Sequence, residues 1–309
     1  MKDKKIPSVK IFAISFIAVI VFLFFLSTIE SDSISLFVKT LQNQPILVLF
    51  FILSVLIASS IQGYVVKILV DFFSIKLSFR EWISIAFLTE AGNYITPFRG
   101  GMILKATYLK KKHGFDYSKF LSIEASRRIV NFILFGFLGI ITSIFIYVNG
   151  IFVPEPIFII FAGTFVIGIS ITLIKSIGVH ENKILNFFSK TVDGWNEIKK
   201  NKKLLTKLFL LDFVMSFVSG FRIYIIFLMF SHQISPIFAY SVGLITLISL
   251  VISIIPAGLG IKEAVFVYYA FLLGLSVETS IYIATIDRLF VMLIVFAFAL
   301  PASYFLSKK

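Results

Sequence analysis

Long apolar segments separated by short polar links dominate the sequence. A helix rises about 1.5 Å per residue, so roughly 20 apolar residues cross the hydrocarbon core of a bilayer. Segments of this kind predict six full membrane-spanning helices, at Lys10–Ser27, Pro45–Leu69, Ile129–Val148, Ile157–Ile174, Leu208–Phe230 and Ile281–Phe305. The pattern therefore predicts an all-α integral membrane protein.

Two further apolar regions, residues 82–108 and 238–275, are interrupted by proline and glycine. The interruptions contain Pro97, Gly100 and Gly101 in the first region, and Pro256, Gly258 and Gly260 in the second. Proline and glycine end helices, and irregular backbone at membrane depth is tolerated only inside protein or along a wet cavity. We expect each break to join two half-helices in a re-entrant hairpin. For the second region, two tight full spans are an equal alternative.

The two breaks resemble each other in spacing, which suggests an internal repeat. The first reads Pro97-x-x-x-Gly101 and the second Pro256-x-x-x-Gly260, and an arginine follows each in the next helix. Three full spans lie between the breaks, so the two halves are predicted to have opposite orientation. Inverted repeats with broken helices are the architecture of many secondary transporters. We expect residues 1–309 to form one polytopic domain, with repeat-like halves at about 45–148 and 208–306.

The composition agrees with a membrane protein and excludes a water-soluble enzyme. The chain is 59% hydrophobic and 15% charged, with a mean hydropathy of +1.00, whereas soluble domains average about a quarter charged residues. A net charge of +13 in so apolar a chain indicates contact with anionic lipid head groups rather than nucleic acid. The sequence has no Cys and three dispersed His, so no metal site, catalytic residue or cofactor is expected.

The placement of lysine and arginine predicts the orientation, because cytoplasmic loops carry an excess of both. The N-terminal ten residues are basic, and the richest basic loop is 175–207. The links 149–156 and 231–236 carry no Lys or Arg and are expected outside. We therefore expect a multi-pass protein of the cell membrane with both termini in the cytoplasm.

Charged residues inside apolar segments are the candidates for function, because a charge at the bilayer centre costs about 2.5–3.5 kcal/mol on insertion scales. Most of them lie at the two breaks and in the helices that follow. The cations expected to bind a lipid head group are Arg99, Lys105, Arg127, Arg128, Lys262 and Arg288. The acids expected to act as counter-ions or proton carriers are Glu90, Glu124, Glu263 and Asp287.

Local spacing suggests partners for some of these charges. Glu124 precedes Arg127 and Arg128 by three and four residues, so the three can meet on one helix face. They form either a phosphate-binding patch or a salt bridge that only positions the helix. Asp212 lies near the basic loop and is interpreted as a solvated helix-end residue. Glu263 either caps its own helix or pairs with another segment, such as the arginine of the last span.

Both breaks resemble the motifs of a known membrane family. The string Pro256-Ala-Gly-Leu-Gly-Ile-Lys-Glu263 resembles the Pro-Gly-Gly-Leu-Gly-x-Arg-Glu signature of the lysylphosphatidylglycerol synthase transmembrane-region family, also called flippase-like. The first break, Pro97-Phe-Arg-Gly-Gly-Met-Ile-Leu-Lys105, resembles its Pro-Gly-Arg-x-Gly-Glu-x-x-Arg motif. The resemblance implies a membrane domain that moves or accommodates a polar lipid, such as aminoacylated phosphatidylglycerol. Carried over by position, it implies functional or motif roles for Arg99, Lys105, Lys262, Glu263 and Arg288.

Three positions depart from the family pattern. Met102 stands where glutamate is usual, Arg127 where a glutamate would precede an arginine, and Asn131 where aspartate is common. These changes remove acids, so an anionic head group, such as phosphatidylglycerol or a polyprenyl phosphate, fits better than a cationic aminoacyl head. The soluble aminoacyl-transferring domain of full-length synthases is not found in this sequence. Lysyl transfer by this chain alone is therefore not expected.

We expect a flippase that moves phosphatidylglycerol, its aminoacylated form or a lipid-linked phosphate between leaflets. One alternative is a membrane-embedded enzyme or subunit of a phosphatidylglycerol lysyltransferase-type system, which predicts turnover in detergent. Another is a scaffold that recruits a soluble transferase through the basic loop, and a homo-oligomer is also compatible. Neutralising four loop lysines should abolish scaffolding while lipid movement survives: Lys199, Lys200, Lys202 and Lys203.

Overall fold

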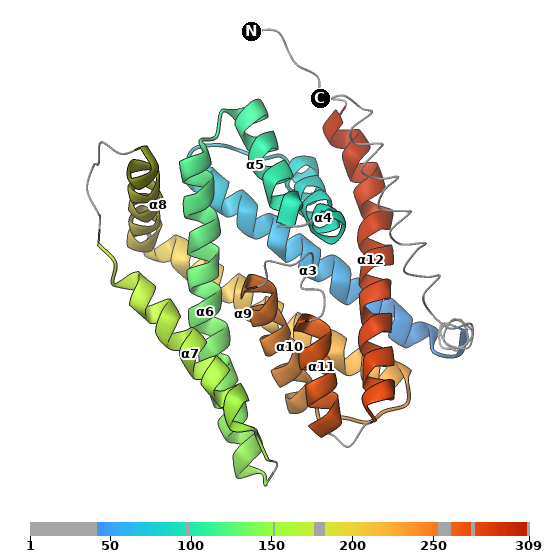
Figure 1. The fold of residues 1–309 in the computed structure, drawn as a ribbon. Helices are drawn as coiled ribbons and strands as arrows, with labels where there is room; N and C mark the ends of the chain where they lie inside the picture. Colours follow the sequence, from blue (N-terminus) through green and yellow to red (C-terminus); the bar gives the residue numbers. More distant parts are fainter. Residues whose placement is uncertain are drawn as a thin grey trace.

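The computed structural model describes residues 42–96, 99–150, 152–175, 183–252, 261–272 and 276–307, and the regular secondary structure in these ranges is helical (Figure 1). In chain order the helices are α3 (Pro45–Phe72), α4 (Phe79–Ile95), α5 (Gly100–His113), α6 (Tyr117–Val148), α7 (Glu155–Thr172), α8 (Lys183–Lys200), α9 (Lys202–Met229), α10 (Pro236–Ile252), α11 (Ile261–Leu272) and α12 (Val277–Ser307).

Five of these helices are long and apolar enough to cross a membrane, namely α3, α6, α7, α9 and α12. They correspond to five of the six predicted spans, and the sixth, Lys10–Ser27, lies outside the described residues. Large apolar side chains such as Phe145 and Val148 are more than half exposed on their surfaces, as expected for helices that face lipid. The predicted all-α membrane fold is confirmed.

The first broken region forms two antiparallel half-helices, α4 and α5, which confirms the predicted break. Glycines allow them to pack closely. A Cβ atom on Gly92 would lie 2.8 Å from Gly101 Cα, and a Cβ atom on Gly101 would collide with the backbone oxygen of Thr89. Gly100 and Gly101 begin α5, whereas Pro97 lies outside the described residues.

The second broken region also contains two short helices that lie against each other, α10 and α11. The ring of Tyr269 packs edge-on against Phe238, with 5.4 Å between ring centroids. The described parts of α10 and α11 span 17 and 12 residues, fewer than the roughly 20 that a full span needs. The predicted break residues Pro256, Gly258 and Gly260 lie outside the described residues.

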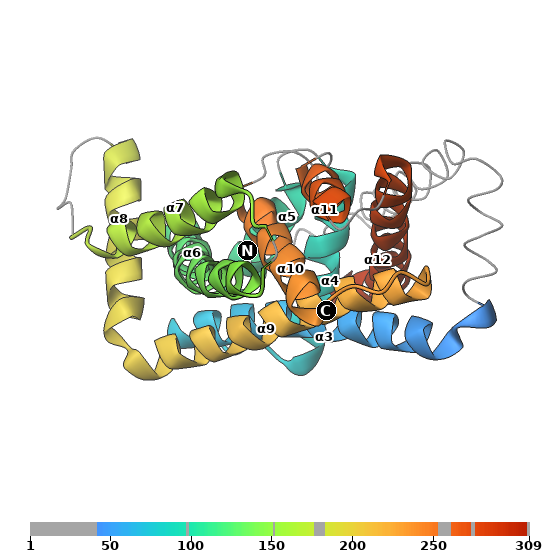
Figure 2. The same cartoon turned by 90° about the horizontal axis from the view of Figure 1, so that it is seen from below.

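The two helix pairs open toward opposite ends of the molecule. In Figure 1 the end of α5 and the start of α6 lie at the end of the molecule that carries α8, whereas the end of α11 and the start of α12 lie at the other end. Seen from below, α3 and α9 run side by side along one face (Figure 2). An inverted repeat requires two helix pairs whose open ends face opposite ends of the molecule. The repeat itself stays a prediction.

The basic loop contains a helix, α8, that packs on α6. Trp195 and Ile198 of α8 are buried, and a Cβ atom on Gly194 would collide with the side chain of Ser122 in α6. Lys199 Nζ donates a hydrogen bond of 2.8 Å to the carbonyl oxygen of Thr172 at the end of α7. It thereby satisfies one of the carbonyls that a helix end leaves open. Lys199 therefore links α8 to the end of α7.

Candidate functional site

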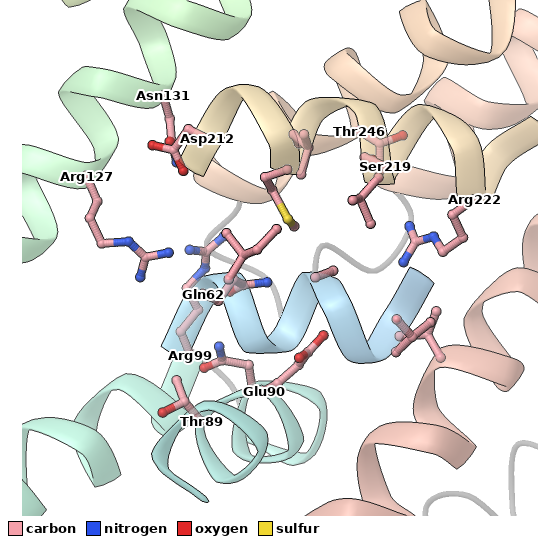
Figure 3. A pocket seen from close by; sticks show the side chains of 18 of the residues that line it. Gln62, Thr89, Glu90, Arg99, Arg127, Asn131, Asp212, Ser219, Arg222 and Thr246 are labelled. Carbon is pink, nitrogen blue, oxygen red and sulfur yellow. The ribbon is translucent and has the colours of Figure 1, made fainter. Parts of the chain in front are cut away.

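A cavity of about 220 Å³ lies between the first hairpin and helices α3, α6, α9, α10 and α12 (Figure 3). Six cationic side chains line it, namely Arg99, Lys105, Arg127, Arg128, Arg222 and Arg288. Three acidic side chains also line it, namely Glu90, Glu124 and Asp212. Because charges are costly inside an apolar protein, this cationic excess favours the entry of an anionic group.

Most of the residues that the sequence singled out meet at this cavity. Five of the six predicted cations line it, and so do the predicted acids Glu90 and Glu124. Asp287 contacts the cavity-lining side chain of Arg222. The side chains of Lys262 and Glu263 lie outside the described part of the chain.

Arg99 occupies the tip of the first hairpin in a strained backbone conformation. Its φ of 55° and ψ of 51° are left-handed, which costs about 1–2 kcal/mol for an L-residue with a side chain. Its guanidinium reaches toward the cavity (Figure 3), within electrostatic range of Arg127, Arg128 and Glu124. The hairpin tip thus presents a cation to the cavity from a position that glycine would occupy more easily.

Glu124 pairs with a different cation from those expected. Its Oε1 atom lies 2.6 Å from Lys105 Nζ on α5, and both side chains are buried. Arg127 and Arg128 lie in electrostatic range of Glu124, as their spacing predicts, and Lys105 is an additional partner that the spacing did not indicate. Spacing along a helix makes these residues neighbours, but the hairpin brings an ammonium group from another helix into direct contact. Lys105 is engaged by this ion pair and also lies 5.5 Å from the ring centroid of Phe120.

Asp212 is buried, so its interpretation as a solvated helix-end residue is wrong. It is 4% exposed and lines the cavity. With its amide oriented to satisfy both groups, Asn131 donates hydrogen bonds to Asp212 Oδ2 at 2.8 Å and to the backbone oxygen of Arg127 at 3.3 Å. Helix α9 begins at Lys202, and ten residues of helix rise carry Asp212 about 15 Å inward from that end.

Arg222 is a cavity residue that was not among the predicted site residues. Its Nε atom lies 3.5 Å from Oδ1 of Asp287, which is fully buried on α12. Beside it, the guanidinium of Arg288 lies 5.7 Å from the ring centroid of Tyr94, a distance typical of a cation–π contact. A lone arginine in the middle of an apolar span is itself a functional signal, and Arg222 is one of the charges within the predicted spans.

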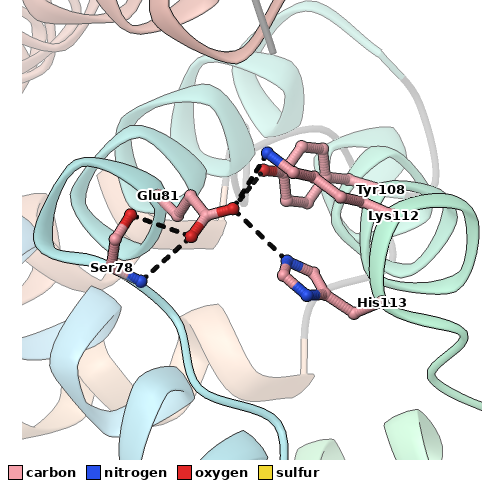
Figure 4. Close-up of polar contacts among 5 residues, drawn as sticks. All are labelled: Ser78, Glu81, Tyr108, Lys112 and His113. Atoms are coloured by element: carbon pink, nitrogen blue, oxygen red, sulfur yellow. Dashed lines mark hydrogen bonds and ion pairs between the residues drawn. The ribbon is translucent and has the colours of Figure 1, made fainter.

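A second polar cluster holds the open end of the first hairpin together and lies apart from the cavity (Figure 4). Glu81 Oε2 accepts hydrogen bonds from the backbone N and Oγ of Ser78, at 3.0 and 2.8 Å. Glu81 Oε1 accepts from Tyr108 Oη at 3.1 Å and lies 2.9 Å from Lys112 Nζ and 3.4 Å from His113 Nε2. These contacts tie α4 to the last turn of α5.

The surroundings of Glu81 keep it ionised. Burial alone would raise the pKa of this carboxyl, but the hydrogen bonds from Ser78 and Lys112 outweigh burial and lower the pKa to about 2, against an ordinary 4.5. The cluster is therefore charged at neutral pH. It fixes the half-helix that presents Arg99 to the cavity.

The chain matches one family model over almost its whole length. The family is described as the lysylphosphatidylglycerol synthase TM region, and the match covers residues 11–299. These bounds include both broken regions and every cavity-lining residue. No curated protein and no solved structure matches the chain. Since the match covers far more than half of the sequence, the protein belongs to the lysylphosphatidylglycerol synthase TM region family.

Proposed function

We propose that the protein moves an anionic lipid between the two leaflets of the cell membrane, with the head group in the cavity and the acyl tails in the bilayer. The substrate is phosphatidylglycerol or a lipid-linked phosphate. The observation that carries the proposal is the cationic excess of a cavity inside a protein with five candidate spans. The family supports a role in lipid modification or transport.

The arginines supply the chemistry that a phosphate group needs. A guanidinium donates paired hydrogen bonds to phosphate oxygens and sheds its water more easily than an ammonium group. Arg99, Arg127 and Arg128 reach the cavity from α5 and α6. A phosphodiester that enters between them loses its hydrating water and gains charge-assisted hydrogen bonds from the arginines. The free-energy barrier for moving the head group across the hydrocarbon layer is therefore lower.

The charges of the wall favour phosphatidylglycerol over its aminoacylated form. Glu124 is already engaged by Lys105 at 2.6 Å, and Asp212 accepts a hydrogen bond from Asn131. A lysyl head group brings cationic amines, which the surrounding arginines repel. With both termini in the cytoplasm, as lysine placement predicts, the α4–α5 hairpin opens toward the cytoplasm and α10–α11 toward the outside.

The test is lipid movement by the purified chain in vesicles of phosphatidylcholine that contain fluorescent phosphatidylglycerol. A membrane-impermeant reductant bleaches only the labelled lipid in the outer leaflet. The slow loss of the remaining fluorescence therefore gives the rate at which lipid moves from the inner to the outer leaflet. The double variant Arg99→Gln with Arg127→Gln should slow movement about 100-fold, since each charge-assisted hydrogen bond contributes about 1.5 kcal/mol or more.

The matched control is Lys111→Gln with Lys207→Gln, which removes the same charge from exposed positions outside the cavity. It should move the lipid at the wild-type rate. If wild type moves no phosphatidylglycerol, or if both double variants slow movement equally, the proposed function is wrong.

A further inference from the structure

We propose that the cavity contains a second phosphate-binding site, so that a phosphate group passes between two stations on its way through the protein. We call Arg99, Arg127 and Arg128 the first station. The second station consists of Arg222 on α9, Thr246 on α10 and Arg288 on α12. The lipid as ligand rests on the proposed function, whereas the second station rests on its own geometry.

The two stations lie at opposite ends of the cavity. Asp212, beside the first station, and Arg222 lie ten residues apart on α9, which corresponds to about 15 Å of helix rise. This distance is about half the thickness of the hydrocarbon core, whereas a hydrogen bond reaches about 3 Å. Figure 3 shows Arg127 and Arg222 at opposite ends of the cavity. A single phosphate group must therefore move through the cavity to occupy first one station and then the other.

The second station has donors that the described residues do not satisfy. Thr246 is 1% exposed and lines the cavity, and its Oγ1 atom has no hydrogen-bond partner among the described residues. Within the same described part of the chain, Arg222 Nε also makes no hydrogen bond and has only its longer contact with Asp287. Because a buried donor without an acceptor costs about 1–3 kcal/mol, both groups favour an entering anion.

Close packing of α9 against α10 brings these donors to the cavity. A Cβ atom on Gly243 would lie 2.7 Å from the backbone nitrogen of Gly220, and Ser219 Oγ donates to the carbonyl oxygen of Gly243 at 3.3 Å. Arg222 and Thr246 follow this crossing by two and three residues. The packing of α9 against α10 thus fixes the positions of Arg222 and Thr246 in the cavity wall.

Each station has a buried aspartate next to an arginine, contributed by another helix. Asp212 on α9 lies in electrostatic range of Arg127 on α6, and Asp287 on α12 lies 3.5 Å from Arg222 on α9. A buried cation left without a counter-charge is strongly destabilising. The aspartates supply that counter-charge when the phosphate is elsewhere. They also weaken phosphate binding, which allows the phosphate to leave.

The absence of cysteine from the sequence gives a direct test. The variant Thr246→Cys places the only thiol of the protein at the second station. In nanodiscs of phosphatidylcholine, an anionic methanethiosulfonate should react with this thiol about tenfold faster than a cationic one, which corresponds to about 1.4 kcal/mol of preference. Adding Arg222→Gln to this variant should remove the preference, whereas adding Lys111→Gln should preserve it.

Ligand protection identifies the source of the phosphate. Phosphatidylglycerol in the nanodisc should slow the reaction of the Thr246→Cys variant about tenfold, and inorganic phosphate should not. Protection by inorganic phosphate alone would keep the site but overturn the lipid as its ligand. The control Thr142→Cys lies on α6, buried and outside the cavity, and its reaction should not respond to lipid.

The outcomes separate this inference from the proposed function. If wild type moves phosphatidylglycerol but the Thr246→Cys thiol shows neither charge preference nor protection, the second station is wrong and the proposed function stands. If the thiol is protected by phosphatidylglycerol but wild type moves none, the second station stands and the proposed function is wrong.

Discussion

The two short-helix pairs share an outline, but different contacts hold them together. The α4–α5 pair is tied by the charged cluster around Glu81 and by the close approach of Gly92 and Gly101. The α10–α11 pair is tied by the Tyr269 ring against Phe238 and by a 3.2 Å hydroxyl contact between Tyr269 and Ser241. The cohesion of the two helix pairs thus depends on residues that differ between them.

The substitution Gly101→Ala should destabilise the α4–α5 pair more than any other change considered for the two pairs. The added methyl group would collide with the backbone oxygen of Thr89, and backbone cannot move aside without separating α4 from α5. We expect a loss of about 3 kcal/mol, the upper range for overpacking, seen as a lower midpoint of thermal unfolding in detergent. Gly163→Ala on α7 adds the same methyl where nothing lies within 4 Å. An equal shift in both variants would contradict the packing argument.

The substitution Glu81→Gln should come next, because it removes the charge that ties α4 to α5. Losing hydrogen bonds to a charged group costs about 2 kcal/mol. Trp82 is adjacent, and in a Trp195→Phe background it is the only tryptophan, so its fluorescence reports unfolding of this hairpin. Glu197→Gln makes the same chemical change at an exposed position of α8. No difference between the two variants would rule out a stabilising role for the cluster.

Acidification should weaken the first pair of helices but not the second. The pKa of Glu81 is lowered from 4.5 to about 2 in the folded protein. Its contribution is therefore complete above pH 4.5 and is lost as the pH falls toward 2. The temperature midpoint of unfolding, followed by Trp82 fluorescence, should fall more steeply over this pH range in the Trp195→Phe protein than in the same protein with Glu81→Gln. Parallel curves for the two proteins would show that Glu81 does not titrate as described.

The substitution Tyr269→Phe should have the smallest effect, because it keeps the ring and removes only one hydroxyl contact of α10–α11. A neutral hydrogen bond contributes about 1 kcal/mol. Tyr147→Phe, at a residue that is 70% exposed, controls for the loss of a hydroxyl. The two variants should be compared by thermal unfolding at neutral and acidic pH. A loss for Tyr269→Phe that grows on acidification would contradict the uncharged nature of this contact.

Hydropathy and helix breakers were enough to predict the five spans and the first break that the described residues contain, because both are local properties of the chain. The pairing of charges was not predictable in this way. Glu124 has two arginines within four residues, but it also forms an ion pair with Lys105, 19 residues earlier on another helix. Arg222 meets Asp287, which lies 65 residues later. Such contacts depend on how helices are placed relative to one another.

Helix α9 carries both Asp212 and Arg222, and this has a consequence for how the chain can change. A helix advances by 100° per residue, so inserting or deleting one residue between these positions would swing one of them around the axis, away from the cavity. Point substitutions leave that angular register intact. The number of residues between the two charges is therefore fixed by the cavity that both of them face.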